Sequence, residues 1–94
     1  MKKVLVLAAT AALSMNVLAS GEAMFNSLGC AGCHGVGGKS QIPTYPSLAG
    51  LDAAHIVKQL KDFQSGARKD PTMNAMAPMA AGHEQAIADY LSKQ

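Results

Sequence analysis

The sequence has 94 residues with a formal net charge of +2, and hydrophobic side chains make up 49% of it. Lys2 and Lys3 account for the excess positive charge, so residues 20–94 carry equal numbers of basic and acidic side chains. This balance argues against a nucleic-acid partner, which would require a basic face. A chain of this length builds only a small core, and such domains commonly recruit a disulfide, a metal or another bound group.

The first 19 residues, MKKVLVLAATAALSMNVLA, have the organisation of a secretory signal peptide. Two lysines precede an apolar run, and small or aliphatic residues occupy positions 17–19, where cleavage would occur. Polar residues interrupt the run, which leaves it short for a membrane span of about 20 apolar residues. We predict cleavage after Ala19 and export to the periplasm, with residues 20–94 as one domain that has no membrane span. A retained N-terminal anchor is the alternative.

Three segments of the exported part have helical patterns. Residues 20–29 come first, with Ser20 placed to cap the helix. Residues 51–66 have apolar side chains at helical spacing and Gly66 as a stop, and residues 83–93 repeat the apolar spacing at the end of the chain. No stretch alternates as a strand would, so we predict an all-α domain of about three helices.

Two long segments, HGVGGKSQIPTYPSLAGL and ARKDPTMNAMAP, separate these helices. They are rich in Gly, Pro and Ser, which predicts loops. Loops of this length are uncommon in a small domain unless they enclose something. The exported part has two Phe, two Tyr and no Trp, so a bulky apolar cofactor would supply the missing interior.

The motif CAGCH, formed by Cys30, Cys33 and His34, has three chemical interpretations. It can form a redox disulfide, supply part of a zinc site, or attach haem through two thioethers with the histidine on iron. A thioredoxin-like site would need a βαβ pattern, and zinc would need a further ligand such as His55 or His83. A signal peptide and a downstream methionine-rich segment favour covalent haem c.

Haem iron with one histidine ligand requires a sixth ligand or keeps an open position. Met73, Met76 and Met79 are the candidates, and a thioether ligand raises the reduction potential and suits electron transfer. Most of these methionines can instead fill gaps in the core. Three thioethers could also bind copper(I), which we consider a weaker alternative.

The order of these features resembles class I monohaem cytochromes c over essentially the whole exported part. The details KQLKDFQSGAR and MNAM are similar to small bacterial c-553-like cytochromes and to one lobe of dihaem cytochromes c. The resemblance implies a cytochrome c fold, with helices and loops wrapped around the haem and the C-terminal helix crossing the N-terminal one. Phe25, Tyr90 and Leu91 match the packing contact between those helices.

The resemblance also implies roles for individual residues. Pro46, with Leu48 and Gly50, matches a Pro-x-Leu-x-Gly pattern whose proline carbonyl accepts a hydrogen bond from the haem histidine, here His34. The first methionine of the M-x-x-M pair binds iron in such proteins, which implies Met73. The entry to the last helix, AAGHEQ, is one residue shorter than the family pattern, so Met76 is held in reserve and Met79 ranks third.

The function implied is one-electron transfer in the periplasm, without catalysis, to redox proteins that bind transiently. The alternative is a haem subunit of a larger oxidoreductase, or a gas-binding or catalytic haem protein with an open sixth position. His55 and His83 are expected to face solvent. Arg68, Lys69 and Tyr45 are weak candidates for contact with the haem propionates.

Overall fold

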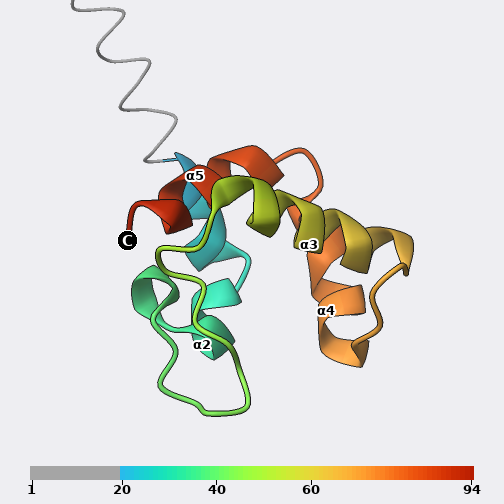
Figure 1. The fold of residues 1–94 in the computed structure, drawn as a ribbon, viewed down its shortest axis with the longest axis horizontal. Helices are drawn as coiled ribbons and strands as arrows, with labels where there is room; N and C mark the ends of the chain where they lie inside the picture. Colours follow the sequence, from blue (N-terminus) through green and yellow to red (C-terminus); the bar gives the residue numbers. More distant parts are fainter. Residues whose placement is uncertain (1–19) are drawn as a thin grey trace, which may run out of the picture.

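The computed structural model describes residues 20–94, and the predicted signal peptide of residues 1–19 lies outside this part of the chain. The described elements are the N-terminal helix (20–27), α2 (Cys30–His34), the 3-10 turn η1 (Val36–Gly38), α3 (Ala53–Ser65), α4 (Pro71–Met76), the 3-10 turn η2 (Ala77–Ala80) and α5 (Glu84–Ser92) (Figure 1). No strand occurs between residues 20 and 94, so the predicted all-α class is confirmed.

The N-terminal helix and α5 pack closely against each other. The rings of Phe25 and Tyr90 are tilted against one another, with 6.0 Å between their centroids. Gly21 is buried where the two helices meet, and a Cβ there would clash with the backbone of Ala86. A residue without a side chain therefore allows this close approach.

Helix α3 provides the other wall of the core. Ile56 is buried in one cluster with Phe25, Ile87 and Leu91, and α3 lies against α5 (Figure 1). Burial of these apolar faces is the main favourable term in a fold of this kind. Since α3 contacts α5 and both are amphipathic, the core lies between helices that are far apart in the sequence.

The ends of α3 follow from its flanking residues. The Asp52 carboxylate accepts a hydrogen bond from the His55 backbone N–H at 3.3 Å, so Asp52 is the N-cap. Gly66 ends the helix with a left-handed φ of 82°, the conformation that glycine adopts at helix C-termini. The predicted helix over 51–66 is thus confirmed with a slightly later start.

Two local predictions were wrong. Ser20 is itself helical, and a capping residue lies before the first helical residue, so Ser20 is not the N-cap. The segment predicted as a second loop contains α4 and η2. Pro71 occupies the first turn of α4, where its missing N–H costs nothing, and the Asp70 carboxylate caps the helix by accepting from the Met73 N–H at 2.8 Å.

Residues 35–52 form the first predicted loop, with the short turn η1 near its start. The carbonyl of Gly38 accepts hydrogen bonds from the N–H groups of Leu48 and Ala49, and the Gly50 N–H donates to the Leu91 carbonyl of α5 at 2.9 Å. The first two bonds therefore close the loop on itself, and the third ties its end to α5.

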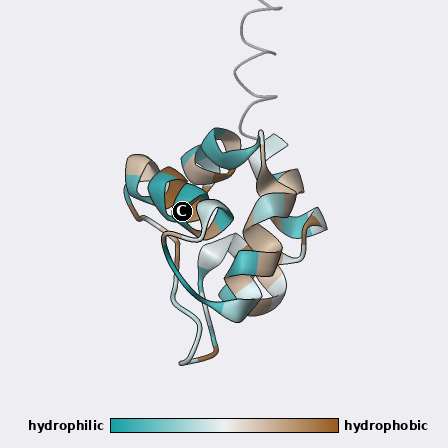
Figure 2. Ribbon diagram, turned by 90° about the vertical axis from the view of Figure 1, so that its right-hand side faces the viewer, coloured by the Kyte–Doolittle hydropathy of each residue, from teal (hydrophilic) through white to brown (hydrophobic). Residues whose placement is uncertain are grey.

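Helices α3 and α5 are amphipathic, and each turns its apolar face toward the core. Hydrophilic and hydrophobic colours are mixed along the helices in Figure 2, and none of the helices drawn in colour is hydrophobic throughout. Within residues 20–94 no helix has the length and apolar character required to cross a membrane.

Candidate functional site

The CAGCH motif forms α2, a single turn and a half of helix between two glycines with positive φ. Cys30 and Cys33 are both free and half-buried. Residues three apart lie on the same face of a helix, so the two thiols are placed to react with one flat group. Burial, with a smaller contribution from Cys33, raises the pKa of the Cys30 thiol. Redox cysteines have lowered pKa values, so this environment is unlike that of a redox disulfide.

His34, the last residue of α2, is buried. Its Nδ1 lies 2.8 Å from the carbonyl oxygen of Pro46. A carbonyl can only accept, so Nδ1 carries the proton and Nε2 keeps the lone pair that a metal requires. This is the hydrogen bond that the resemblance implied for Pro46. Tyr45, the neighbour of Pro46, approaches the His34 ring edge-on, with 6.3 Å between centroids.

The other two histidines are exposed, as expected. No three side chains among the His, Cys, Asp and Glu residues of the described chain are close enough to hold a metal ion. A zinc site built on the two cysteines would need such a ligand. His55 and His83 therefore do not complete one in this structure.

The three candidate methionines differ in environment. Met73 and Met76 lie three residues apart on α4 and are both half-buried, whereas Met79 on η2 is 55% exposed. In Figure 1, α2 and α4 both lie below α3, at opposite ends of it. The histidine and the two half-buried thioethers therefore come from separate segments that flank α3.

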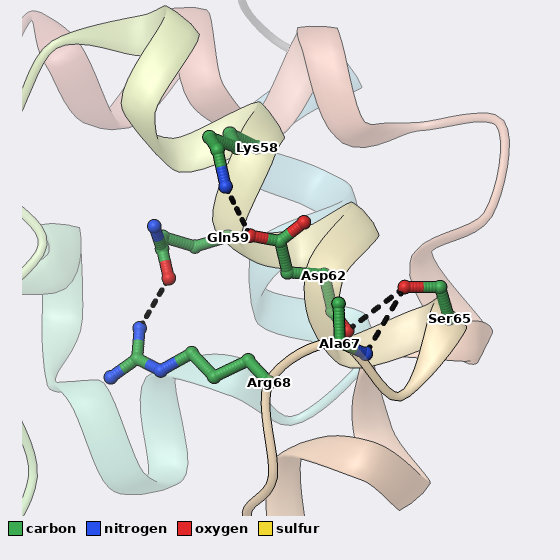
Figure 3. A network of polar contacts seen from close by, with 6 residues as sticks. All are labelled: Lys58, Gln59, Asp62, Ser65, Ala67 and Arg68. Carbon is green, nitrogen blue, oxygen red and sulfur yellow. Dashed lines mark hydrogen bonds and ion pairs between the residues drawn. The ribbon is translucent and has the colours of Figure 1, made fainter.

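Arg68, a weak candidate for contact with a haem propionate, makes a different contact in the structure. Its guanidinium donates to the Gln59 side-chain oxygen (Figure 3). The same guanidinium lies over the Phe63 ring, 4.7 Å from the centroid. Both partners belong to α3, as does the nearby ion pair between Lys58 and Asp62. Arg68 thus covers the end of α3, and Lys69 is exposed.

Sequence reasoning missed two polar residues beside the methionines. Asn74 on α4 and Gln64 on α3 each make several side-chain hydrogen bonds to backbone or side-chain partners on neighbouring segments. The Asp-Pro pair before the methionines was the available sequence signal for a helix start at this point. No local pattern identifies the tertiary partners of these amides.

The two thiols, the His34 imidazole and the methionine thioethers are the kinds of donor that a covalently attached haem requires. Two free thiols share one helical turn, the adjoining histidine has an oriented ring, and thioethers lie on a separate segment. The chemistry of the residues present fits the group that the motif implies.

Comparison with known proteins agrees with this assignment. The profile of the cytochrome c family matches residues 18–94. Cytochrome c-553 of Helicobacter pylori is 36% identical over 97% of this chain and 96% of its own length. The thiosulfate dehydrogenase electron acceptor of Thiomonas intermedia is 38% identical over 99% of this chain but 44% of its own length. Cytochrome c4 of Thiocapsa roseopersicina is 40% identical over 80% of this chain and 38% of its own length.

The chain belongs to the cytochrome c family. It therefore carries a covalently bound haem c, attached by the motif that contains Cys30, Cys33 and His34. The chain spans less than half the length of several of the curated relatives that it matches, including the thiosulfate dehydrogenase electron acceptor and cytochrome c4.

Proposed function

We propose that the protein is a periplasmic one-electron carrier with His34 and Met73 as the axial ligands of its haem iron. The observation that supports this most directly is the hydrogen bond from His34 Nδ1 to the Pro46 carbonyl. It leaves Nε2 as the free donor, beside two unpaired thiols on the same helical turn. Together with family membership, this arrangement favours a permanently ligated haem.

Each residue has a distinct task in this proposal. Cys30 and Cys33 would form the thioethers, Pro46 would orient the His34 ring through its carbonyl, and Met73 would supply a thioether ligand to the iron. When bound, haem c supplies an iron that takes up and releases one electron, so no substrate bond is made or broken. The partners are redox proteins of the cell envelope that bind transiently, and residues 1–19 are removed on export.

The names of two relatives favour a second candidate function, that of a haem subunit of an oxidoreductase. The cytochrome subunit of sulfide dehydrogenase of Chlorobaculum tepidum is 40% identical over 68% of this chain and 58% of its own length. The electron acceptor of thiosulfate dehydrogenase is also similar. In this candidate function the same haem site accepts electrons from an attached or closely associated enzyme.

Attachment and export are tested together. The full chain is expressed in a bacterium that matures c-type cytochromes, and the protein is purified from the periplasm. Haem should stay on the chain after treatment with acid acetone, because thioethers are covalent, and the N-terminus should be near Ser20. Extractable haem would contradict the attachment, and a mature N-terminus at Met1 would indicate a retained anchor.

Ligation separates a carrier from a haem protein with an open sixth position. The oxidised carrier should show a methionine–sulfur charge-transfer band at the red end of its spectrum, and the reduced form should bind CO slowly. Rapid CO binding without this band would favour a gas-binding or catalytic protein. Stable co-purification with a dehydrogenase would favour the subunit.

A further inference from the structure

Helix α4, which carries Met73 and Met76, has little apolar anchorage of its own. It has six residues, and none of them is buried. An isolated helix of this length is unstable in water, because nucleation costs more than a few hydrogen bonds return. Contacts outside the helix must therefore fix its position.

Asn74, the fourth residue of α4, makes the first such contact. Its Nδ2 donates to the carbonyl oxygens of Phe63 and Arg68, both at 2.9 Å, and its Oδ1 accepts from the Asp70 N–H at 2.8 Å. Both amide hydrogens and the amide oxygen are thus used. One side chain joins the last turn of α3, the connecting loop and the N-cap of α4.

Gln64 makes the second contact, just beyond the end of α4. Its Nε2 donates to the Ala77 carbonyl at 3.0 Å and to the Glu84 carboxylate at 2.9 Å. Glu84 also accepts from the Gly82 N–H at 3.0 Å. Gln64 therefore joins α3 to the residue that follows α4 and to the start of α5.

We propose that Asn74 and Gln64 are positioning residues that hold α4 in place, so that its methionine remains on the iron. The inference rests on the proposed function and adds to it a structural reason for stable ligation. The Asn74 amide contacts Asp70, the N-cap of α4, and the Gln64 amide contacts Ala77, just beyond its end. Met73 lies between Asp70 and Ala77. Loss of either amide should increase the fraction of molecules in which the methionine has left the iron.

The experiment uses the haem-loaded protein and substitutions that keep the side-chain shape. Asn74→Asp removes the two donated hydrogen bonds and places a carboxylate against two carbonyl oxygens. Gln64→Glu removes the donors to Ala77 and Glu84. CO must displace the methionine to bind the reduced iron, so its binding reports departure of the ligand. Since each lost hydrogen bond costs on the order of a factor of ten, we expect CO binding to be about tenfold or more faster in each variant.

A matched control exists on α5. Gln85 also donates its side-chain amide to a carboxylate, that of Asp89, at 2.9 Å, but both residues lie on the same helix and Gln85 is exposed. Gln85→Glu makes the same chemical change away from α4. Ile56→Val, in the core, serves as a second control because it lowers stability without touching either amide. Both controls should keep the wild-type rate of CO binding and an intact sulfur–iron band.

The outcomes distinguish this inference from the proposed function. If Asn74→Asp and Gln64→Glu change CO binding no more than Gln85→Glu does, the positioning role is wrong, although Met73 can still be the ligand. If Met73→Ala keeps the sulfur–iron band, the proposed ligand is wrong. If the variants do not fold, hydrogen exchange by NMR on the wild-type protein decides. The side-chain amide protons of Asn74 and Gln64 should exchange much more slowly than those of Gln85, and equal rates would overturn the inference.

Discussion

Apart from Tyr90, His34 is the only residue with a polar or charged side chain that is buried in residues 20–94. A buried imidazole with one partner has a defined tautomer, and here the Pro46 carbonyl determines it. The role of Pro46 thus depends on its backbone oxygen and not on its ring. An adjacent metal would bind at Nε2, and the hydrogen bond at Nδ1 would hold the ring in the orientation that this binding requires.

The first prediction concerns the sixth ligand. Met73→Ala should remove the sulfur–iron charge-transfer band, lower the reduction potential and allow rapid CO binding, because the thioether stabilises the reduced iron. Met76→Ala should cost packing only, about 1–3 kcal/mol of unfolding free energy if the side chain is buried in the loaded protein. Met79 is exposed, so Met79→Ala should leave both the haem properties and the free energy of unfolding unchanged. Spectra and redox titration of the three variants test this.

The comparison among the variants also identifies errors in the assignment. If Met76→Ala removes the band and Met73→Ala keeps it, the iron ligand is the second methionine of the M-x-x-M pair and not the first. The proposed electron-transfer function would be unchanged. If no methionine replacement alters the spectrum, His55 and His83 become the ligands to test, and the carrier would work at a lower potential.

At the scale of elements, periodicity predicted α3 and α5 because each buries one apolar face against the other. It could not predict α4, which has only six residues and buries none of them, so it is too short to show a repeated apolar pattern. The CAGCH chemistry was predictable because all three residues are local in sequence. The roles of Asn74 and Gln64 were not, because their acceptors belong to segments that only the folded chain brings close.

The second prediction compares two helix caps. Asp70 caps α4 and Asp52 caps α3, each by accepting from a backbone N–H three residues on. Replacing either aspartate with Ala should cost about 1 kcal/mol of unfolding free energy. Only Asp70→Ala should also speed CO binding, because α4 carries the proposed ligand. Equal CO rates in the two variants would contradict the link between this cap and ligation.

The third prediction concerns the whole molecule and tests the packing of the N-terminal helix against α5. Gly21→Ala would place a methyl group against the Ala86 backbone and should lower the free energy of unfolding by about 1–3 kcal/mol, as overpacking does. Ala23→Ser changes an exposed position of the same helix and should stay within about 0.5 kcal/mol of wild type. Denaturant unfolding of the haem-loaded variants measures both. A Gly21→Ala variant as stable as Ala23→Ser would show that the helices can separate without cost.

The last prediction is a dependence of stability on pH, carried by the contact of Glu84 with α3 and with the turn before α5. The hydrogen bond from Gln64 is the main reason that the pKa of Glu84 lies below its ordinary value of 4.5, and burial acts in the opposite direction. Since the folded-state pKa is the lower one, the charged carboxylate stabilises the fold above the unfolded pKa, and this contribution is lost as the pH falls through the folded pKa.

Glu84→Gln should therefore lose less stability than wild type between about pH 5 and pH 3, as measured by urea unfolding. Gln64→Ala should flatten the pH dependence in the same way, because it removes the largest cause of the shift while leaving the carboxylate in place. Parallel stability curves for all three proteins would mean that Glu84 has the same pKa in the folded and unfolded chains. The bond to Gln64 would then hold the segment after α4 equally well whether or not the carboxyl group is charged.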